Sequence, residues 1–326
     1  MLFKLKLHMN DKPILQKDIA EVLGISINTV SHALRGLPDI SAETTAKVRN
    51  KAKEMGYIPN SMAIKLKTGS SKTIALVYDN LINPYFMIMA SKLFELIKSR
   101  GYDCLICPSG NNSILDTKVF NDLLPLQVDG IFSFLDVEEK VATSKAFQAN
   151  NVVIVGRASV HNISSIYVDD FHGGELVGEY FKNKGYKNIL YVGAHEISES
   201  SKRLNGLKTV YGDSIMAVEF SEKDDVSRLV NFIKENNIDA VFGFNDILAT
   251  IVQKAIEQEK LPIDVVGFDA IHKTLPFVDD ITSVTYDFDK IAENAIEELM
   301  RKINGDDSVQ KIKISVSLYL KGETNL

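Results

Sequence analysis

Polar and aromatic side chains follow several short apolar runs in this sequence, where they could hold a small molecule. Asn83, whose amide both donates and accepts hydrogen bonds, comes shortly after "TIALVYD". Tyr85 and Phe86 come next, and their rings can stack on the face of a sugar or a base. Asn245 lies at the end of "AVFGFN", and Asp269 at the end of "DVVGFD". These residue types favour hydrogen-bonded recognition of a small polar ligand.

Motifs for catalysis are missing from the sequence. It contains no P-loop, no GxGxxG after an apolar run, no GxSxG and no HExxH. His161, His172, His195 and His272 are scattered and lack the spacing of metal ligands. We therefore expect a protein that is not an enzyme and that uses neither a metal nor a cofactor.

Cys104 and Cys107 have the spacing of a CxxC motif, but they lie in "YDCLICP", which reads as a buried strand. Residues three apart on a strand point to opposite faces, so the two thiols are not expected to share a metal or a disulfide. We interpret both as core residues.

The elements that position the ligand-binding candidates alternate between strands and helices from Thr73 onward. Apolar runs that look buried on both faces alternate with helical patterns, which indicates parallel sheets covered by helices. The first set is "TIALVYD", "YDCLICP", "VDGIFSF" and "VVIVGR", and the second is "SSIYVDD", "NILYVG", "SIMAVEF", "AVFGFN" and "DVVGFD". A strand and a long helix follow from 281, and "KIKISVSLYL" is expected to close the chain as one strand. Two sets predict two doubly wound subdomains, in which ligands gather beyond the carboxyl ends of the strands.

The N-terminal segment 15–34 reads as two short helices joined by a tight turn. Gly24 lies between them, where a left-handed backbone is easiest for a residue without Cβ, and Ser26 stands at the N-cap of the second helix. Ser41 is expected to cap a third helix that ends at Gly56. Helix, turn and helix match the helix-turn-helix pattern, whose second helix enters the DNA major groove. The alternative is an ordinary helical hairpin.

Charge is divided unevenly along the chain, although its net value is −6. Residues 1–72 carry 12 Lys and Arg against 6 Asp and Glu, whereas the remainder carries 25 against 37. This division suits a basic head that contacts phosphates and an acidic body that stays off the DNA.

Three stretches together resemble the lactose-repressor/purine-repressor (LacI/GalR) family of bacterial transcription regulators. They are "DIAEVLGISINTVSHAL", "GYIPNSMAIKLKTGSSKTIALV" and "INPYF", in this order. The resemblance runs over almost the full length. It implies an all-α helix-turn-helix headpiece followed by an α/β core that is periplasmic-binding-protein-like. It also implies a homodimer on a pseudo-palindromic operator, controlled by an effector in a cleft between two subdomains.

Domain boundaries follow from the motifs and the resemblance. The headpiece is expected at 11–58, a hinge helix and linker at 59–72, and the effector-binding and dimerisation domain at 73–326. Within the last, subdomain 1 is placed at about 73–158 and 288–314, and subdomain 2 at about 159–287 and 315–326. The resemblance implies three crossings of the chain between the subdomains.

Residues at the start of the second helix are placed to contact bases. Asn28 can donate and accept, which suits adenine. His32 departs from the family, which more often has an arginine that grips guanine with two hydrogen bonds, and Leu15 departs where a hydroxyl residue is common. In the hinge, the family wedges a leucine between base pairs, and Leu66 stands at that position. The predicted DNA-binding residues are Ile27, Asn28, Thr29, Ser31, His32, Asn60, Ala63 and Leu66.

The resemblance also assigns ligand-facing roles. It implies an arginine at Arg203 that forks onto ligand hydroxyls or a carboxylate, and an aspartate at Asp269 that accepts hydrogen bonds from hydroxyls. Gly156 stands where many sugar-binding members have an aspartate, and the chain has no Trp. The effector is therefore left open among a neutral sugar, a sugar phosphate and a purine. The predicted effector-binding residues are Asn83, Tyr85, Phe86, Arg157, Arg203, Asn245, Asp269 and Tyr286, and Asp246 is interpreted either with them or as a helix cap.

Two other functions are weighed. One is a regulator of the same family whose partner is a phosphocarrier protein, and the other is a plain sugar-binding protein that serves a transporter. The DNA-binding head argues against the second. "MLFKLKLHMN" is too short for a signal peptide and no apolar run is long enough to span a membrane, so a cytoplasmic, nucleoid-associated protein is expected.

Overall fold

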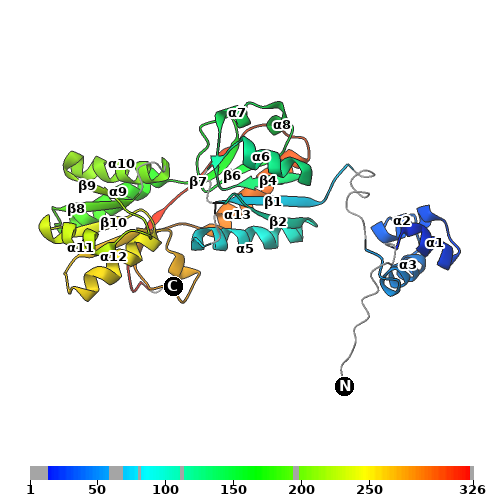
Figure 1. Ribbon diagram of the computed structural model, residues 1–326, viewed down its shortest axis with the longest axis horizontal. Coiled ribbons are helices and arrows are strands. Elements are labelled where there is room, and N and C mark those ends of the chain that lie inside the picture. Colours follow the sequence, from blue (N-terminus) through cyan, green and yellow to red (C-terminus); the bar gives the residue numbers. More distant parts are fainter. Residues whose placement is uncertain (1–13, 59–68, 80–81, 111–113, 194–197, 324–326) are drawn as a thin grey trace, which may run out of the picture. The chain divides into compact units, whose positions relative to one another are not determined.

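The computed structural model describes residues 14–58, 69–79, 82–110, 114–193 and 198–323 (Figure 1). The chain divides into two compact units, one up to Ser71 and the other from Lys72 onward. In the described residues, no helix combines the length and the apolar character needed to cross a membrane.

Residues 14–58 of the first unit form a small three-helix headpiece with its own core. Its helices are α1 (Gln16–Leu23), α2 (Ile27–Arg35) and α3 (Ala42–Glu54). Gly24 takes the left-handed conformation with φ +65° and ends α1, as the sequence predicts. The hydroxyls of Ser26 and Ser41 cap α2 and α3 by accepting hydrogen bonds from backbone N–H groups at 3.0 and 3.2 Å. The core that holds the three helices together comprises Ile19, Ala20, Val30, Ala33, Val48 and Ala52.

The second unit contains two six-stranded sheets, and we call each sheet with its helices a lobe. The first sheet has the order β13 (Lys311–Ile314), β7 (Ser164–Val168), β6 (Val152–Val155), β4 (Gly130–Ser133), β1 (Thr73–Tyr78) and β2 (Asp103–Pro108), with all neighbours parallel. The second has the order β14 (Ser317–Tyr319), β12 (Thr282–Thr285), β11 (Asp264–Phe268), β10 (Ala240–Gly243), β8 (Ile189–Gly193) and β9 (Met216–Glu219). Only β14 runs antiparallel to its neighbour among these described strands.

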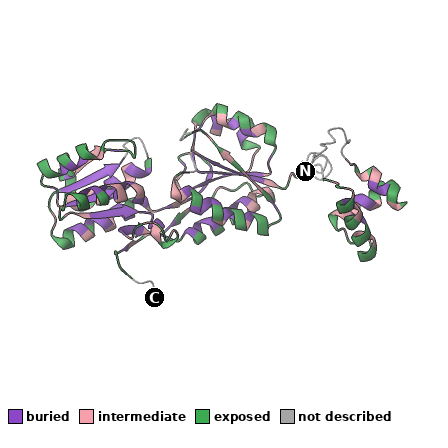
Figure 2. Cartoon of the chain, turned by 60° about the horizontal axis from the view of Figure 1, so that its bottom comes forward, coloured by how far each residue is buried: buried purple, intermediate pink, exposed green. Residues whose placement is uncertain are grey.

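Helices cover both faces of each sheet, and the strands are buried between them (Figure 2). In the first lobe, α5 (Pro84–Ser99) and α13 (Phe288–Ile303) pack on one face, while α6 (Thr117–Leu123), α7 (Glu139–Ala142) and α8 (Lys145–Gln148) cover the other. In the second lobe, α9 (Asp170–Lys184) and α10 (Ser198–Tyr211) lie opposite α11 (Val226–Glu235) and α12 (Asp246–Gln258) (Figure 1). Short 3-10 helices at 124–126, 212–214 and 271–273 and a two-stranded pair, β3 (Ile114–Leu115) and β5 (Asp136–Val137), complete the unit.

Along the residues that the structure describes, the chain crosses between the lobes three times, after β7, after β12 and after β13. The expected lobe boundary at 158/159 is wrong, because β7 pairs with β6 and with β13 and so belongs to the first lobe. The expected single strand 311–320 is also wrong, since β13 joins the first sheet and β14 the second. Apolar periodicity shows that a strand is buried, but it does not show which sheet the strand joins.

One further prediction, that of a buried strand with two core cysteines, needs correction. The "YDCLICP" strand is β2, which lies at the edge of its sheet and is only half-buried, with Ile106 47% exposed. Cys104 and Cys107 are partly buried, free thiols that pack on opposite sides of β2. In the same lobe, α7 and α8 are separate short helices, because the Ser144 hydroxyl begins a new helix by accepting a hydrogen bond from the N–H of Phe147.

Candidate functional sites

The start of α2 presents polar and apolar side chains to solvent. Ile27 is 53% exposed, Asn28 is exposed and Thr29 is half-buried, with its hydroxyl 2.8 Å from that of Ser26. Ser31 is different, because it lies on the buried side of the helix and is only 5% exposed. Ser31 stays a predicted DNA-binding residue, but its burial distinguishes it from the exposed start of α2.

His32 lies one turn beyond Asn28 on the same face of α2, and its side chain is 23% exposed. Its ring nitrogen Nδ1 is 2.5 Å from a carboxylate oxygen of Asp39, which stands in the turn between α2 and α3. No pattern in the sequence predicts a contact between these two residues, which are seven positions apart. The other predicted DNA-binding residues, Asn60, Ala63 and Leu66, lie outside the described residues.

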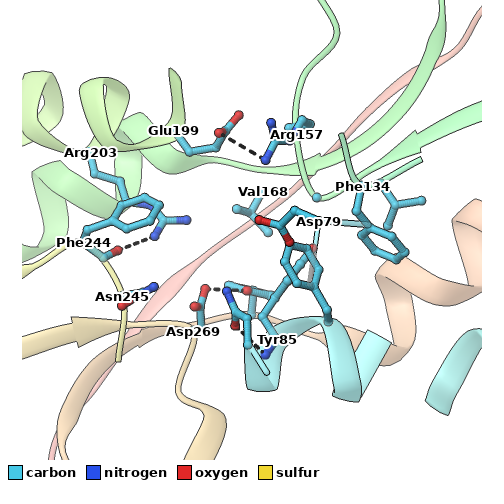
Figure 3. A pocket seen from close by; sticks show the side chains of 15 residues that line it. Asp79, Tyr85, Phe134, Arg157, Val168, Glu199, Arg203, Phe244, Asn245 and Asp269 are labelled. Carbon is cyan, nitrogen blue, oxygen red and sulfur yellow. Dashed lines mark hydrogen bonds and ion pairs between the residues drawn. The ribbon is translucent and has the colours of Figure 1, made fainter. Parts of the chain in front are cut away.

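A cavity of about 130 Å³ lies between the two lobes of the second unit (Figure 3). Loops after β1 and β6 supply its wall from the first lobe, and α10 with the loops after β10, β11 and β12 supplies the wall from the second. These are carboxyl ends of parallel strands, where a ligand site is expected in sheets of this kind. All eight side chains that the sequence predicts for effector binding line this cavity: Asn83, Tyr85, Phe86, Arg157, Arg203, Asn245, Asp269 and Tyr286.

Arg203 is the most constrained side chain of the cavity. Its Nε and Nη2 atoms each lie 2.8 Å from one carboxylate oxygen of Asp170, at the start of α9. Nη1 also donates a hydrogen bond to the carbonyl of Phe244, and the guanidinium carbon lies 3.5 Å from the ring centroid of Phe268. Burial acts to lower the pKa of Arg203, but the carboxylates of Asp170 and Asp269 outweigh it and raise the pKa, so the guanidinium is charged.

Close packing of α9 on α10 fixes this ion pair. A Cβ on Gly174 would lie 2.0 Å from the carbonyl oxygen of Arg203, and a Cβ on Gly206 would lie 1.9 Å from that of Phe171. No side chain larger than hydrogen fits at either position, so the two helices can approach until Asp170 reaches Arg203.

Asp269 holds an unusual backbone conformation at the edge of the cavity. It is the last residue before a left-handed turn and has φ +110°, which is costly for a residue with Cβ. The hydroxyl of Tyr286 donates to its carboxylate at 2.7 Å, and its own N–H donates to the carbonyl of Val284 at 2.9 Å. Burial raises the pKa of Asp269 to about 6, although the positive charge of Arg203 and the Tyr286 hydrogen bond oppose the shift.

Tyr85 explains why residue 156 is a glycine. A Cβ at Gly156 would lie 2.2 Å from the Tyr85 hydroxyl, so this hydroxyl occupies the space that a side chain at 156 would need. The ring is held by Phe86, Phe134 and Phe288, at centroid distances of 5.4, 6.4 and 6.0 Å. The hydroxyl is buried and has no hydrogen-bond partner among the described residues, and burial raises its pKa, so it is a protonated donor.

Glu199 is a cavity residue that the sequence analysis missed. It is 5% exposed, and neither carboxylate oxygen has a hydrogen-bond partner among the described residues. Nη2 of Arg157 faces it across the cavity at 3.9 Å, while Nη1 of Arg157 lies 3.2 Å from Asp136 (Figure 3). Glu199 stands four positions before Arg203 on α10, and this helical spacing was the available signal. Asp79, Phe134 and Phe244 were missed as well.

The neighbouring residues Asn245 and Asp246 have different roles. Asn245 lines the cavity and caps α12, since its side-chain oxygen accepts from the N–H of Leu248 at 3.0 Å. Asp246 turns away into the second lobe, where it accepts from the N–H of Ile271 at 2.8 Å and from the hydroxyl of Ser283 at 2.6 Å. Asp246 is therefore structural. In the parts of the chain that the structure describes, no cluster of three His, Cys, Asp or Glu side chains could hold a metal.

Comparison with known proteins divides the chain into the same two units as the structure. Residues 16–60 match the model of the lacI family of bacterial regulatory proteins, and residues 74–307 match that of the periplasmic binding protein domain. The sucrose operon repressor of Streptococcus mutans is 26% identical over 94% of this chain and 98% of its own length. The HTH-type transcriptional repressor PurR of Mannheimia succiniciproducens is 25% identical over 94% of this chain and 97% of its own. The lac repressor dimer, solved with operator and the anti-inducer ONPF, has a TM-score of 0.81 at 20% identity and covers 95% of this chain and 98% of its own.

A helix-turn-helix unit joined to a two-lobed domain with a polar cavity defines a DNA-binding transcriptional regulator with an effector domain, and not an enzyme. The chain belongs to the LacI family of bacterial transcriptional repressors, as its sequence motifs predict.

Proposed function

We propose that this protein is a homodimeric repressor whose two headpieces bind the halves of a pseudo-palindromic operator in the cytoplasm. A two-fold dimer requires a two-fold site, which is the reason for the palindrome. We propose further that an uncharged carbohydrate in the cavity between the lobes controls this binding. The observation that carries the effector assignment is the presence of buried polar atoms on the cavity wall, the Tyr85 hydroxyl and the Glu199 carboxylate oxygens, which have no hydrogen-bond partner among the described residues.

Charge in the cavity favours a neutral ligand over a phosphorylated one. Both arginines already face carboxylates: Arg203 is paired with Asp170, and Arg157 lies between Asp136 and Glu199. The Glu199 carboxylate has no hydrogen-bond partner in the described chain and would repel a phosphoryl group. Hydroxyl groups, in contrast, donate to carboxylates and accept from the Tyr85 hydroxyl, so a polyhydroxylated molecule satisfies both residues.

Size favours a monosaccharide. The cavity volume of about 130 Å³ corresponds to roughly ten water molecules at ~10–15 Å³ each, which is close to the size of one sugar ring. The rings of Tyr85, Phe86, Phe134 and Phe244 line the cavity and supply apolar faces on which a sugar can stack. The name of the sucrose operon repressor, among the relatives of this chain, agrees with a carbohydrate effector.

Coupling between the effector and DNA arises because the cavity belongs to both lobes. A ligand that contacts Arg157 of the first lobe and Glu199 of the second binds one relative position of the lobes better than another. Such differential binding typically changes the affinity at a second site by ~1–3 kcal/mol. We propose that a change in lobe position alters how the two headpieces of a dimer are held for the operator.

A dimer surface is suggested by exposed apolar side chains on the first lobe. Met87 and Phe94 on α5 are 41% and 49% exposed, and Ile106 on the adjacent edge strand β2 is also half-exposed. Large apolar side chains that cluster at a surface are typical of protein interfaces. Analytical ultracentrifugation of the full chain should show a dimer, and Phe94→Glu should shift it toward the monomer.

The effector assignment is tested by thermal denaturation of the full chain with a panel of neutral monosaccharides and disaccharides, sugar phosphates and purines. A ligand that binds only the folded state raises the melting temperature. We expect a rise with a neutral sugar, and we expect Glu199→Gln to weaken that ligand. A rise with sugar phosphates or purines alone would contradict the neutral-sugar assignment. The operator assignment is tested in parallel by mobility shift on the DNA upstream of the gene, with a protein lacking residues 1–71 as the control that should not bind.

A further inference from the structure

We propose that Asp39 positions His32 so that His32 reads one base pair of the operator as a hydrogen-bond acceptor, and therefore selects cytosine or adenine instead of guanine. This inference rests on the proposed DNA binding by α2. His32 is a base-contacting residue already predicted from the sequence; the new elements are its role as an acceptor and the positioning role of Asp39.

The geometry of the pair determines which ring nitrogen is available. Nδ1 of His32 lies 2.5 Å from a carboxylate oxygen of Asp39, and an ionised carboxylate can only accept a hydrogen bond. Nδ1 therefore carries the proton of the ring. Because the hydrogen bond at one nitrogen decides the state of the other, a neutral ring presents a lone pair at Nε2, whereas a doubly protonated ring would present a second N–H there. Nε2 has no hydrogen-bond partner in the described part of the chain.

The position of His32 directs this lone pair to the DNA. His32 shares a helix face with the exposed residue Asn28, whereas Val30 and Ala33 face the headpiece core. Its side chain is 23% exposed, so part of the ring is covered and its orientation is restricted. In the major groove, an acceptor pairs with the exocyclic amino group of cytosine or adenine, whereas guanine presents only acceptors there.

The negative charge of Asp39 opposes DNA binding, so its presence in the headpiece calls for another role. A carboxylate with 55% side-chain exposure in a DNA-binding headpiece repels phosphates and lowers non-specific affinity. By orienting His32, Asp39 increases discrimination between bases, and this offsets the loss of non-specific affinity. Removal of Asp39 is therefore expected to raise affinity for random DNA while it lowers the preference at one base pair.

The experiment is selection of bound sequences by the full-length protein from a pool of duplexes randomised over one operator length. The wild type, His32→Arg, Asp39→Ala, Asp39→Glu and Glu43→Gln are compared. Arginine grips guanine, so the base pair at which His32→Arg introduces guanine identifies the position that residue 32 faces. Glu43 is an exposed carboxylate at the start of α3 that pairs with Lys47 at 2.8 Å, so Glu43→Gln controls for the loss of one negative charge.

At the position found in this way, we expect the wild type to prefer cytosine or adenine over guanine by about ten-fold, the usual size of one base contact. Asp39→Ala should reduce that preference to about two-fold or less and leave the other positions unchanged, and Asp39→Glu should restore part of it. Glu43→Gln should raise non-specific affinity without changing any base preference. Circular dichroism and thermal melting confirm that each variant is folded.

Three outcomes are distinguishable. If the wild type selects no sequence at all, the proposed DNA binding fails and the inference fails with it. If the wild type selects a sequence with guanine at the residue 32 position, a doubly protonated ring acts as a donor and the inference is overturned while DNA binding stands. If Asp39→Ala keeps the wild-type preference at that position, Asp39 does not position His32.

Discussion

The headpiece and the effector cavity use polar side chains in opposite settings. In α2, Asn28 is exposed and is held in place by the helix that carries it. In the cavity, Arg203 and Asp269 are buried, and each is held by contacts from elements distant in the sequence. Substitutions in the headpiece should therefore change DNA recognition at little expense of stability, whereas substitutions in the cavity should change both. The predictions that follow test this difference, in order of expected size.

The largest effect is expected for Arg203→Ala. This change leaves Asp170 as a buried carboxylate without its cation, which typically costs ~3–5 kcal/mol of unfolding free energy. Chemical denaturation of residues 72–326 measures the loss. The double variant Asp170→Ala with Arg203→Ala should be less destabilised than Arg203→Ala alone, because no uncompensated charge is left. Equal losses in the single and double variants would show that the ion pair is not the source of the effect.

A second test concerns Gly206, where α10 meets α9. Gly206→Ala places a Cβ 1.9 Å from the carbonyl oxygen of Phe171 and must push the helices apart, at a cost of about 2–3 kcal/mol. Asn205→Ala, on the exposed side of the same helix, is the matched control and should change stability by less than ~0.5 kcal/mol. Similar melting curves for the two variants would contradict the close packing of α9 and α10.

The third test couples Tyr85 with Gly156. Gly156→Ala should destabilise the second unit by about 2 kcal/mol, partly through its left-handed backbone with φ +87° and partly through contact with the Tyr85 hydroxyl. Tyr85→Phe removes that hydroxyl, so the double variant should recover about 1 kcal/mol relative to the additive sum. A double-mutant cycle by urea denaturation provides the number, and strict additivity would contradict the contact.

The pH dependence of stability tests the environment of Asp269. Its folded pKa of about 6 is higher than its ordinary value of 3.8, so the folded state binds this proton more tightly than the unfolded state. The stabilisation from protonated Asp269 is fully present below about pH 4 and is lost as the pH rises through 6. The unfolding free energy of the wild type, relative to Asp269→Asn, should therefore fall by about 1–2 kcal/mol between these values. A flat difference would show that Asp269 is not perturbed.

Much of the architecture could be read from the sequence because it depends on local patterns. The headpiece helices follow from Gly24, Ser26 and Ser41, and the alternation of strands and helices follows from apolar periodicity. The pairing of strands was harder to predict from the sequence. The prediction assigned β7 to the wrong lobe, and the expected single strand at 311–320 is two strands, β13 and β14. Both errors concern the choice of sheet, which apolar periodicity does not encode: β7 pairs with β6 nearby in the chain, and also with β13, whose residues lie more than a hundred positions away.

Site residues show the same division between local and long-range information. The eight cavity residues could be named because strand ends and family motifs mark them. Glu199 was missed: its helical spacing from Arg203 was visible, but its role depends on Arg157 facing it from the other lobe. The pairing of Tyr85 with Gly156 also escaped, although the departure from the family at position 156 was visible. The glycine at position 156 could be interpreted only after the structure showed that the Tyr85 hydroxyl fills the space of a side chain there.

The most direct test of the account is a titration of a fluorescently labelled operator duplex with the full chain, with and without the sugar found by thermal denaturation. If the cavity controls α2, the dissociation constant for the operator should change about 5- to 150-fold when the sugar is present, and Glu199→Gln should reduce the change. An unchanged dissociation constant at a sugar concentration that saturates the cavity would contradict the account.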